Sequence, residues 1–185
     1  MFRPKAAYAH LAAHPASGRW LPWRRPLLVA LILGCTISLI TSRSLTLRLA
    51  ASGTVTWSFV PLLEIGSLAA IWRHRPRLIS RSRAVDLFFT GHGPWSFWLI
   101  GFGAFWSSVS QSDFSTATEY FWLGSVPVML LWSGYIDFCF LQGVLGRSRT
   151  RAIRDLLLQR AICWGAGILI FGYGSLWADI VERLP

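Results

Sequence analysis

Apolar residues in this chain gather in long blocks rather than in amphipathic stripes. Residues 27–40 and 161–177 are uncharged blocks of this kind, and short arginine-rich segments separate such blocks. A helix that crosses a bilayer needs about 20 mostly apolar residues. The pattern therefore predicts an all-α fold, a polytopic transmembrane helix bundle with about five spans. The predicted spans lie at residues 26–42, 49–72, 94–109, 120–142 and 156–178.

Prolines mark specific positions in three of these spans. Pro26 suits the first turn of a helix, where its missing N–H costs nothing. Pro61 predicts a kink in the second span, because it leaves a backbone carbonyl unpaired one turn earlier. Pro94 opens the third span afresh, and Val85–Phe89 before it is predicted to be an interfacial turn or a short helix.

Cationic residues predict the orientation. Five precede the first span, five lie between the second and third, and five lie at the junction of the fourth and fifth; Arg43, Arg48 and Arg183 fall on the other side. With five spans, all three groups share one face, which the positive-inside rule makes cytoplasmic. We therefore predict a cytoplasmic N-terminus, a C-terminus outside, a basic cytoplasmic flank at 1–25 and a single transmembrane domain at 26–185. The groups are Arg3, Lys5, Arg19, Arg24 and Arg25; Arg73, Arg75, Arg77, Arg81 and Arg83; and Arg147, Arg149, Arg151, Arg154 and Arg160.

The composition favours lipid over nucleic acid as the partner of these cations. Hydrophobic residues make up 54% and charged residues 14% of the chain, against roughly a quarter charged in soluble domains. A net charge of +10 would suggest nucleic acid in a soluble protein. Here the cations flank apolar blocks, where they meet anionic head groups at the cytoplasmic face. Neither a nucleic-acid partner nor a cofactor is predicted.

The N-terminal region and the residue usage indicate a cell membrane location. Arginine outnumbers lysine by 17 to 1, which suggests a GC-rich bacterial genome. Together with the apolar spans, this predicts a multi-pass protein of a bacterial cytoplasmic membrane. Arg24-Arg25 followed by Gly34-Cys35 is similar to a twin-arginine or lipoprotein signal. Because the apolar run continues to Ile40, an uncleaved signal anchor is favoured. The three cysteines lie inside apolar blocks without metal-ligand spacing, so neither a metal site nor a disulfide framework is predicted.

An intramembrane polar cluster is predicted around Glu64 and Asp137. Both carboxylates lie about 13–15 Å above cytoplasmic arginines at ~1.5 Å per helical residue, so they meet at one depth if the second and fourth spans are neighbours. Arg160 and Tyr135 reach toward the same level. The functional interpretation is a proton or cation site. The structural interpretation, which we favour, is an ion pair or hydrogen-bonded knot between helices.

The segment from Asp86 to Trp95 is the second candidate. Gly91 and Gly93 flank His92 and permit an unusual backbone, and the start of a helix at this interface points free N–H groups toward an anion. With Asp86 and His92 as titratable groups, the segment is a candidate interfacial anion or head-group site. The alternative is that the glycines only let the chain turn into the membrane beside bulky neighbours.

Small residues recur along the last predicted span, at Ala161, Gly165 and Gly172 among others. Small side chains let helices approach closely in lipid. This fits packing within the chain, and it leaves membrane-protein partners or a homodimer open.

The layout resembles the Yip family of small five-span membrane proteins. The likeness consists of the cytoplasmic flank, the five spans, the glycine-containing segment Phe89–Gly93 before the third span, and Pro127 in the fourth. The resemblance implies a non-enzymatic integral membrane protein, associated in eukaryotic members with vesicle traffic and small GTPases. Our leading prediction is therefore a multi-pass scaffold or accessory subunit.

Two other functions stay open. One is a small transporter or channel subunit that uses Glu64 and Asp137 as a proton or cation relay. The other is a membrane-embedded enzyme acting on lipid, with His92 and Asp86 near the inner interface. The enzyme is the weakest hypothesis, because the sequence has no serine elbow, cysteine–histidine pair or metal-ligand set.

Overall fold

The computed structural model describes residues 3–14, 21–72, 79–109 and 116–182, with side chains up to residue 170 apart from residues 21 and 117. Within these residues the chain is helical and has no strand, in agreement with the predicted all-α class. The helices are α1 Pro4–Ala13, α2 Leu21–Ser42, α3 Leu47–Trp57, α4 Phe59–Trp72, α5 Arg81–Thr90, α6 Gly93–Ser108, α7 Thr116–Gly143 and α8 Arg149–Glu182.

Three stretches of helix among the described residues are long and apolar enough to cross a membrane. They are Pro22–Ser42, Leu47–Trp72 and Thr118–Gly143, with mean hydropathies of 1.8, 1.4 and 1.4. Large apolar side chains also stay exposed on the helix surfaces, including Phe97 at 78% and Leu131 at 77%. Such exposure suits contact with lipid tails. The three helical stretches and the exposed apolar surface fit a helical membrane protein.

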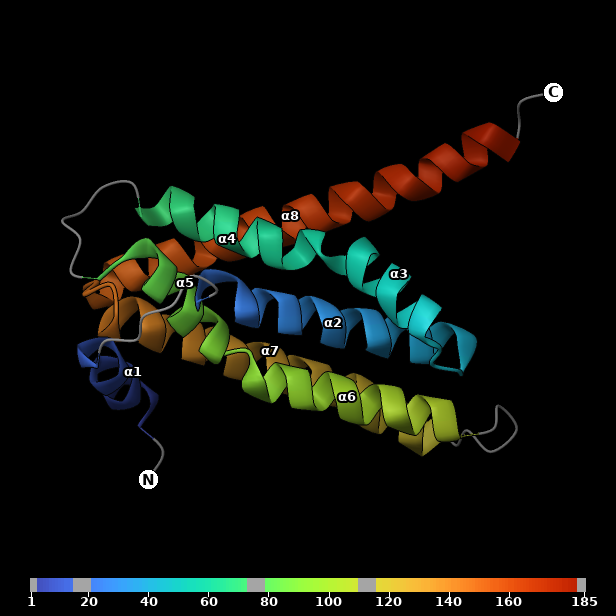
Figure 1. Ribbon diagram of the computed structural model, residues 1–185, viewed down its shortest axis with the longest axis horizontal. Helices are drawn as coiled ribbons and strands as arrows, with labels where there is room; N and C mark the ends of the chain where they lie inside the picture. Colours follow the sequence, from blue (N-terminus) through green and yellow to red (C-terminus); the bar gives the residue numbers. More distant parts are fainter. Residues whose placement is uncertain (1–2, 15–20, 73–78, 110–115, 183–185) are drawn as a thin grey trace.

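The long helices lie side by side and run along the long axis of the molecule (Figure 1). Helix α2 packs against α3, α5 and α6, whereas α4 packs against α8, and α7 contacts α1, α6 and α8. The short helices α1 and α5 gather at one end, on the left in Figure 1, beside the start of α2 and of α8. Helix α1 and the last turns of α8 lie at opposite ends of this view.

Helix boundaries differ from the predicted ones mostly where the apolar blocks end. Helix α2 begins at Leu21, so Pro26 lies beyond the first turn, contrary to the prediction, and Arg24 and Arg25 are part of the helix. Helix α8 begins at Arg149 and continues without a break into the last predicted span. Charged residues extend both helices because they still satisfy backbone hydrogen bonds outside the apolar region.

The second predicted span is interrupted between α3 and α4, and Figure 1 shows the bend at this point. Ser58 separates the two helices, three residues before Pro61. Pro61 has no N–H to donate to the carbonyl of Trp57, so the regular helical ladder is broken there. The predicted kink is therefore present, and its position agrees with the missing proline hydrogen bond.

Helices α2 and α3 approach each other closely through two glycines. A Cβ added to Gly34 would lie 2.3 Å from the backbone nitrogen of Thr54, and one added to Gly53 would lie 2.7 Å from the carbonyl oxygen of Gly34. Ser38 Oγ also donates a 3.1 Å hydrogen bond to the Leu49 carbonyl across this contact. Only glycine at residue 34 lets the two backbones pack at this distance.

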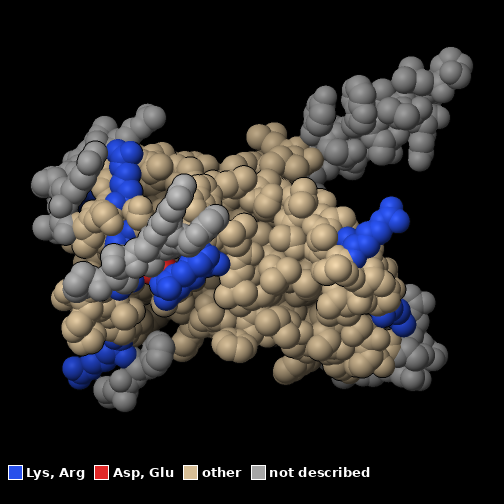
Figure 2. Space-filling model, in the orientation of Figure 1, with Lys and Arg blue, Asp and Glu red and all other residues tan. Residues whose placement is uncertain are grey.

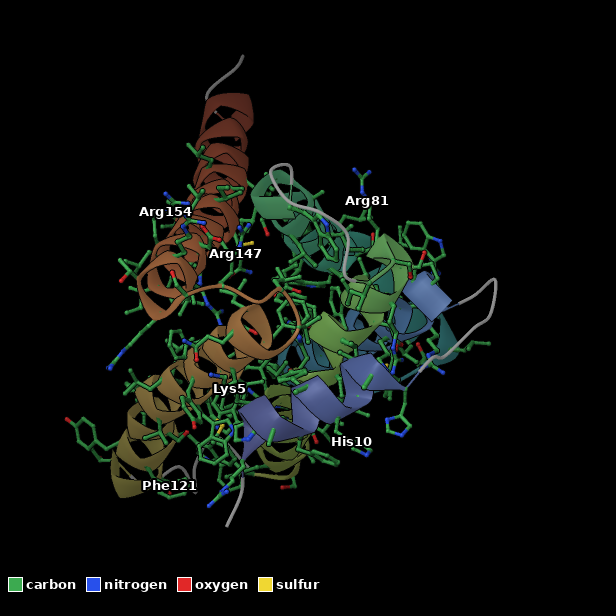
Figure 3. All side chains as sticks on the ribbon, turned by 90° about the vertical axis from the view of Figure 1, so that its left-hand side faces the viewer. Lys5, His10, Arg81, Phe121, Arg147 and Arg154 are labelled. Atoms are coloured by element: carbon green, nitrogen blue, oxygen red, sulfur yellow. The ribbon has the colours of Figure 1, made fainter. Side chains whose placement is uncertain are left out.

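The N-terminal flank contains a helix that packs onto the end of the bundle. Helix α1 lies across this end in Figure 3, with Lys5 and His10 labelled on it. Tyr8 is 5% exposed, and its ring lies 5.7 Å from that of Phe140 in an edge-on contact. A Cβ on Gly91 would lie only 2.5 Å from the Tyr8 hydroxyl oxygen. Burial raises the pKa of the Tyr8 phenol above its usual range, so the group stays neutral at physiological pH.

Candidate functional site

A cavity of about 410 Å³ lies inside the bundle, where α4, the α5–α6 turn, α7 and α8 meet. Its lining combines ionisable groups with aromatic rings. The ionisable groups include Glu64, His92, Asp137 and Arg160. The aromatic residues are Trp57, Phe59, Trp95 and Trp164. The structure thus places three members of the predicted polar cluster, Glu64, Asp137 and Arg160, around one cavity.

Glu64 pairs with a histidine that sequence analysis assigned to a different site. Its Oε1 lies 3.1 Å from His92 Nε2, and both side chains are 13% exposed. Helix α4 supplies Glu64, and His92 lies in the turn between α5 and α6. Glu64 Oε2 is buried and accepts no hydrogen bond from the described residues. Burial lowers the pKa of His92, but the Glu64 charge and hydrogen bond outweigh burial and raise it above its ordinary value, so the pair favours a protonated histidine beside Glu64.

Asp137 forms an ion pair with Arg160, which joins α7 to α8. The same guanidinium group donates a 3.1 Å hydrogen bond to Ser133 Oγ, one helical turn before Asp137. Asp137 is 6% exposed. The guanidinium group of arginine is a cation, so in this arrangement it compensates the charge of the Asp137 carboxylate.

Tyr135 does not belong to the same cluster. Its side chain is 52% exposed and does not line the cavity that Glu64 and Asp137 share. On a helix, residues two positions apart point to different faces, so Tyr135 and Asp137 cannot both face inward. Tyr135 lines a separate hollow on the surface between α7 and α8, together with Arg160.

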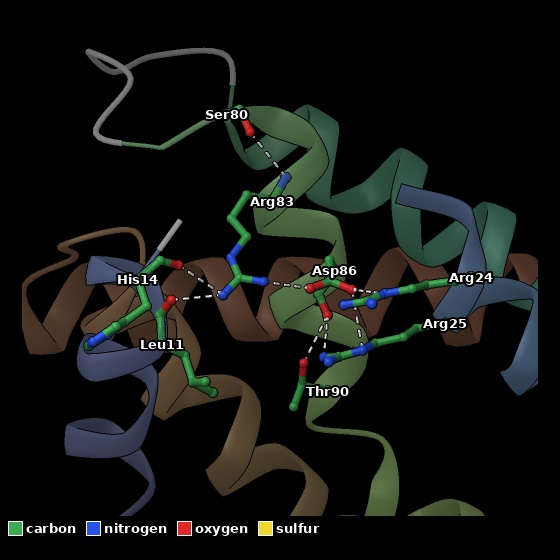
Figure 4. A network of polar contacts seen from close by, with 8 residues as sticks. All are labelled: Leu11, His14, Arg24, Arg25, Ser80, Arg83, Asp86 and Thr90. Carbon is green, nitrogen blue, oxygen red and sulfur yellow. Dashed lines mark hydrogen bonds and ion pairs between the residues drawn. The ribbon is translucent and has the colours of Figure 1, made fainter. Parts of the chain in front are cut away.

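Asp86 is the centre of a second polar network, shown in Figure 4. Its side chain is fully buried and contacts three arginines: Arg24 Nε at 2.9 Å, Arg25 Nε at 3.2 Å and Arg83 Nη1 at 2.8 Å. Arg25 also donates to the Asp86 carbonyl oxygen at 3.0 Å. One carboxylate thereby ties α5 to the start of α2.

Arg83 extends this network to the N-terminal helix. Its Nη2 donates hydrogen bonds to the carbonyl oxygens of Leu11, at 2.8 Å, and His14, at 3.3 Å. Ser80 caps α5 by accepting a 3.2 Å hydrogen bond from the Arg83 backbone nitrogen. The network therefore connects α1, α2 and α5 at the arginine-rich end.

The predicted head-group residues Asp86, Gly91, His92 and Gly93 do not share a single environment. Asp86 faces arginines, and Gly91 packs under Tyr8 of α1. His92 contacts Glu64 at the edge of the cavity, while Gly93 begins α6, and a Cβ added to it would meet nothing within 4 Å. Asp86 lies on α5 and His92 follows the end of the same helix, six residues later, so the two side chains point to different sides of α5. Gly91 and His92 both line the cavity beside Glu64, whereas Asp86 lies among the arginines outside it, so the four residues do not form one ligand site.

Asp155 forms two further ion pairs, one of which joins the α7–α8 turn to the first turns of α8. Arg147 Nε lies 2.9 Å from Asp155 Oδ2, and Arg154 Nη2 lies 3.3 Å from Asp155 Oδ1. Arg147 Nη2 also donates a 2.8 Å hydrogen bond to the carbonyl oxygen of Ile71, at the end of α4. Arg147 therefore connects the end of α4 to the start of α8.

Sequence analysis missed the partners of Asp86 and of Glu64. The spacing of Arg83 and Asp86, three residues apart, is a local signal that predicts their ion pair on a helix. Arg24 and Arg25 lie about 60 residues away, and no periodicity connects them to Asp86. His92 and Glu64 are 28 residues apart, so their pairing depends on how α4 packs beside the α5–α6 turn.

Cationic side chains gather at the end of the molecule that holds these networks. In Figure 2, most of the blue surface on the visible face lies at the left end, and less lies at the right end. Figure 3 looks onto that left end, where Lys5, Arg81, Arg147 and Arg154 come from α1, α5, α8 and the turn before it. Predicted cytoplasmic arginines at 19, 73, 75 and 77, and Arg183 on the opposite side, lie outside the described residues.

Among the described residues, no group of three or more His, Cys, Asp or Glu side chains could hold a metal ion. Cys35, Cys139 and Cys163 are free thiols. Known proteins provide no further guide to the site: no family model, no curated protein and no solved structure matches this chain.

Proposed function

We propose that this protein is a five-span membrane protein with its N-terminus in the cytoplasm. The three apolar helical stretches supply three crossings. Helix α6 has 16 residues and α8 has 34, and these two supply the remaining crossings of the proposal. Support comes from the alternating course of the helices in Figure 1 and from the concentration of arginines at one end, because cations favour the cytoplasmic side.

Its function in this proposal is that of a non-enzymatic scaffold or accessory subunit of Yip-like type. The supporting observation is that carboxylates link separate parts of the fold. Asp86 joins α5 to α2, Asp137 on α7 pairs with α8, and Asp155 on α8 pairs with the turn after α7. Glu64 connects α4 to the α5–α6 turn. Polar groups used in this way fix the arrangement of helices that lipid tails alone do not drive together.

The partners of such a scaffold are anionic lipids at the arginine-rich end and other membrane proteins, including a second copy of this chain. Each basic residue near an anionic surface contributes about 1 kcal/mol of attraction. Co-purification from native membranes after mild cross-linking tests the proposal. A reproducible protein partner at defined stoichiometry supports the scaffold.

The cavity favours a second candidate, a small transporter or channel subunit in which Glu64 and Asp137 act as a proton or cation relay. Ionisable groups near the middle of a span cost roughly 2.5–3.5 kcal/mol each on insertion scales. Here two carboxylates, a histidine and an arginine surround a space of about 410 Å³. A purely structural ion pair needs no such space beside it.

Replacing Glu64 and Asp137 by their amides, singly and together, separates the two candidates. Proton or cation flux is measured in liposomes, and thermal unfolding is measured in detergent with the same preparations. Flux of the natural protein that is lost in stable variants supports the relay. Absence of flux in the natural protein, with unfolding temperatures lowered by the substitutions, supports the scaffold.

A further inference from the structure

We propose that the cavity between α4, α7 and α8 binds a small organic ammonium ion, with Glu64 as its counter-ion. This inference rests on the cavity of the second candidate function and names its ligand class. It does not depend on the number of membrane crossings.

The charges around the cavity favour a cation. Arg160 neutralises Asp137 and is held by Ser133 as well. Glu64 has His92 as its partner. Burial lowers the pKa of His92, but the Glu64 charge and hydrogen bond raise it further, to about 9, so His92 compensates Glu64 below that pH. Once His92 loses its proton, to solvent or in exchange for a bound cation, the two carboxylates and Arg160 sum to a net charge of −1. A charge in a low-dielectric surrounding attracts an opposite charge far more strongly than it does in water.

The hydrogen bonding around Glu64 indicates which carboxylate oxygen would contact a bound cation. His92 contacts Oε1, whereas Oε2 is buried and accepts no hydrogen bond from the described residues. Leaving a buried acceptor unsatisfied costs free energy, more so for a charged group. The N–H group of a primary, secondary or tertiary ammonium ion can donate the hydrogen bond that Oε2 lacks. A quaternary ammonium ion has no N–H group and cannot donate it.

The aromatic lining favours an organic cation over a metal ion. Trp57, Phe59, Trp95 and Trp164 line the same cavity. The faces of aromatic rings attract ammonium groups, and tryptophan does so most strongly. A bare metal ion requires several protein ligands in exchange for its hydration shell, and the described side chains form no group of three metal ligands. The volume of about 410 Å³ lies within the range of roughly 300–1,000 Å³ for small-molecule pockets.

Binding of an ammonium ion competes with protons in this arrangement. The titratable and charged groups that face the cavity are Glu64 on α4, His92 in the α5–α6 turn, Asp137 on α7, and Arg160 and Cys163 on α8. A proton on Glu64 or His92 removes the net negative charge. The affinity for the cation therefore rises with pH, within the range in which the amine itself stays protonated.

Isothermal titration calorimetry of the full-length protein in lipid nanodiscs tests the proposal, with benzylammonium as the probe. Benzyl alcohol is the control, because it has nearly the same size and shape but no charge. We expect saturable binding of benzylammonium that strengthens with pH, and no saturable binding of benzyl alcohol. Equal binding of both ligands, or no saturable binding of benzylammonium, would overturn the proposal. This comparison needs no variant.

Variants identify the residues. Glu64→Gln keeps the shape of the side chain but removes its charge, and we expect it to weaken benzylammonium binding roughly 10- to 100-fold. Trp95→Leu removes one aromatic ring from the cavity lining and should weaken binding roughly 2- to 30-fold. Glu119→Gln is the matched control, because Glu119 is exposed near the start of α7, away from the cavity, and it should leave the affinity unchanged. Unchanged affinity in Glu64→Gln would contradict the assignment of the counter-ion.

The binding experiment tests the ligand site and the flux experiment tests the relay, so either proposal can be contradicted without the other. Benzylammonium binding without proton or cation flux contradicts the relay and leaves the binding site in place. Flux without benzylammonium binding supports the relay and removes the proposed ligand class.

Discussion

Asp86 forms more ion pairs than any other acidic residue that the structure describes, and these pairs connect α2 to α5. Its carboxylate is fully buried between Arg24, Arg25 and Arg83, which are 51%, 30% and 12% exposed. The arginine carbon chains reach inward while Arg24 keeps part of its charge near solvent or lipid head groups. The carboxylate thus compensates three like charges that would otherwise repel one another at the junction of α2 and α5.

Replacing Asp86 by asparagine should destabilise the protein by roughly 3 kcal/mol. Removing one partner of a buried ion pair costs about 3–5 kcal/mol, and the partial exposure of Arg24 and Arg25 places the effect toward the lower limit. Thermal unfolding in detergent measures the change, with Glu119→Gln as the exposed-acid control, expected within about 0.5 kcal/mol of the natural protein. A stability equal to that of the control would show that the arginines need no counter-charge.

At the scale of elements, the contact of α2 with α3 depends on glycine rather than on charge. The Cβ of an alanine at residue 34 would meet backbone atoms of Gly53 and Thr54 at 2.3–2.7 Å. Backbone atoms cannot rotate away as side chains do, so the helices would have to separate. The glycine pair therefore determines how tightly these two elements pack.

Gly34→Ala should destabilise the fold by about 1–3 kcal/mol, the usual cost of overpacking. Gly66→Ala is the matched control, because a Cβ at that position meets nothing within 4 Å. Alanine is the better helix former by about 1 kcal/mol, so the control should be neutral or more stable. Chemical denaturation of both variants in mixed micelles gives the comparison, and equal stabilities would contradict the close packing of α2 and α3.

At the scale of the whole molecule, charge is distributed unevenly between the two ends. The arginine-rich end holds α1, α5 and the networks of Asp86 and Asp155, whereas Arg43 and Arg48 lie at the other end. A membrane protein with this distribution is expected to insert with the arginine-rich end in the cytoplasm.

Labelling of single cysteines in intact cells tests this orientation. In a variant whose three cysteines are replaced, Ser44→Cys and Ser148→Cys place one exposed thiol in the α2–α3 and α7–α8 connections respectively. An impermeant maleimide should label residue 44 in intact cells, and residue 148 only after permeabilisation. Lys5→Cys should behave like residue 148. Labelling of all three positions in intact cells would contradict the proposed topology.

The fold class follows from the apolar blocks, but the ends of the helices and their contacts do not. Block length indicated several membrane-length helices, and Pro61 indicated the break near it, because both features act within a single continuous segment of the chain. Neither the entry of Arg24 and Arg25 into α2 nor the docking of Tyr8 against Phe140 has a periodic signal. Both depend on surfaces that exist only once α5 and α7 are in place.

The residues of the candidate cavity were likewise predicted only in part from the sequence. The cost of burying charge singled out Glu64, Asp137 and Arg160 from sequence, since a carboxylate inside an apolar block requires a partner. His92 was assigned to a separate head-group site, and Tyr135 was assigned to the cluster. Local spacing could not correct either assignment, because the direction of a side chain depends on how its helix is rotated against its neighbours.

By itself, the sequence determined that this chain forms apolar helices with arginines between them, because burial of apolar surface and the cost of charge in lipid act along the chain. Only the tertiary structure decided which charges meet. Asp86 pairs with three arginines, Glu64 pairs with His92, and a cavity lined by aromatic residues lies beside Glu64. Such pairings depend on distances of a few ångströms between segments far apart in sequence, and packing alone sets those distances.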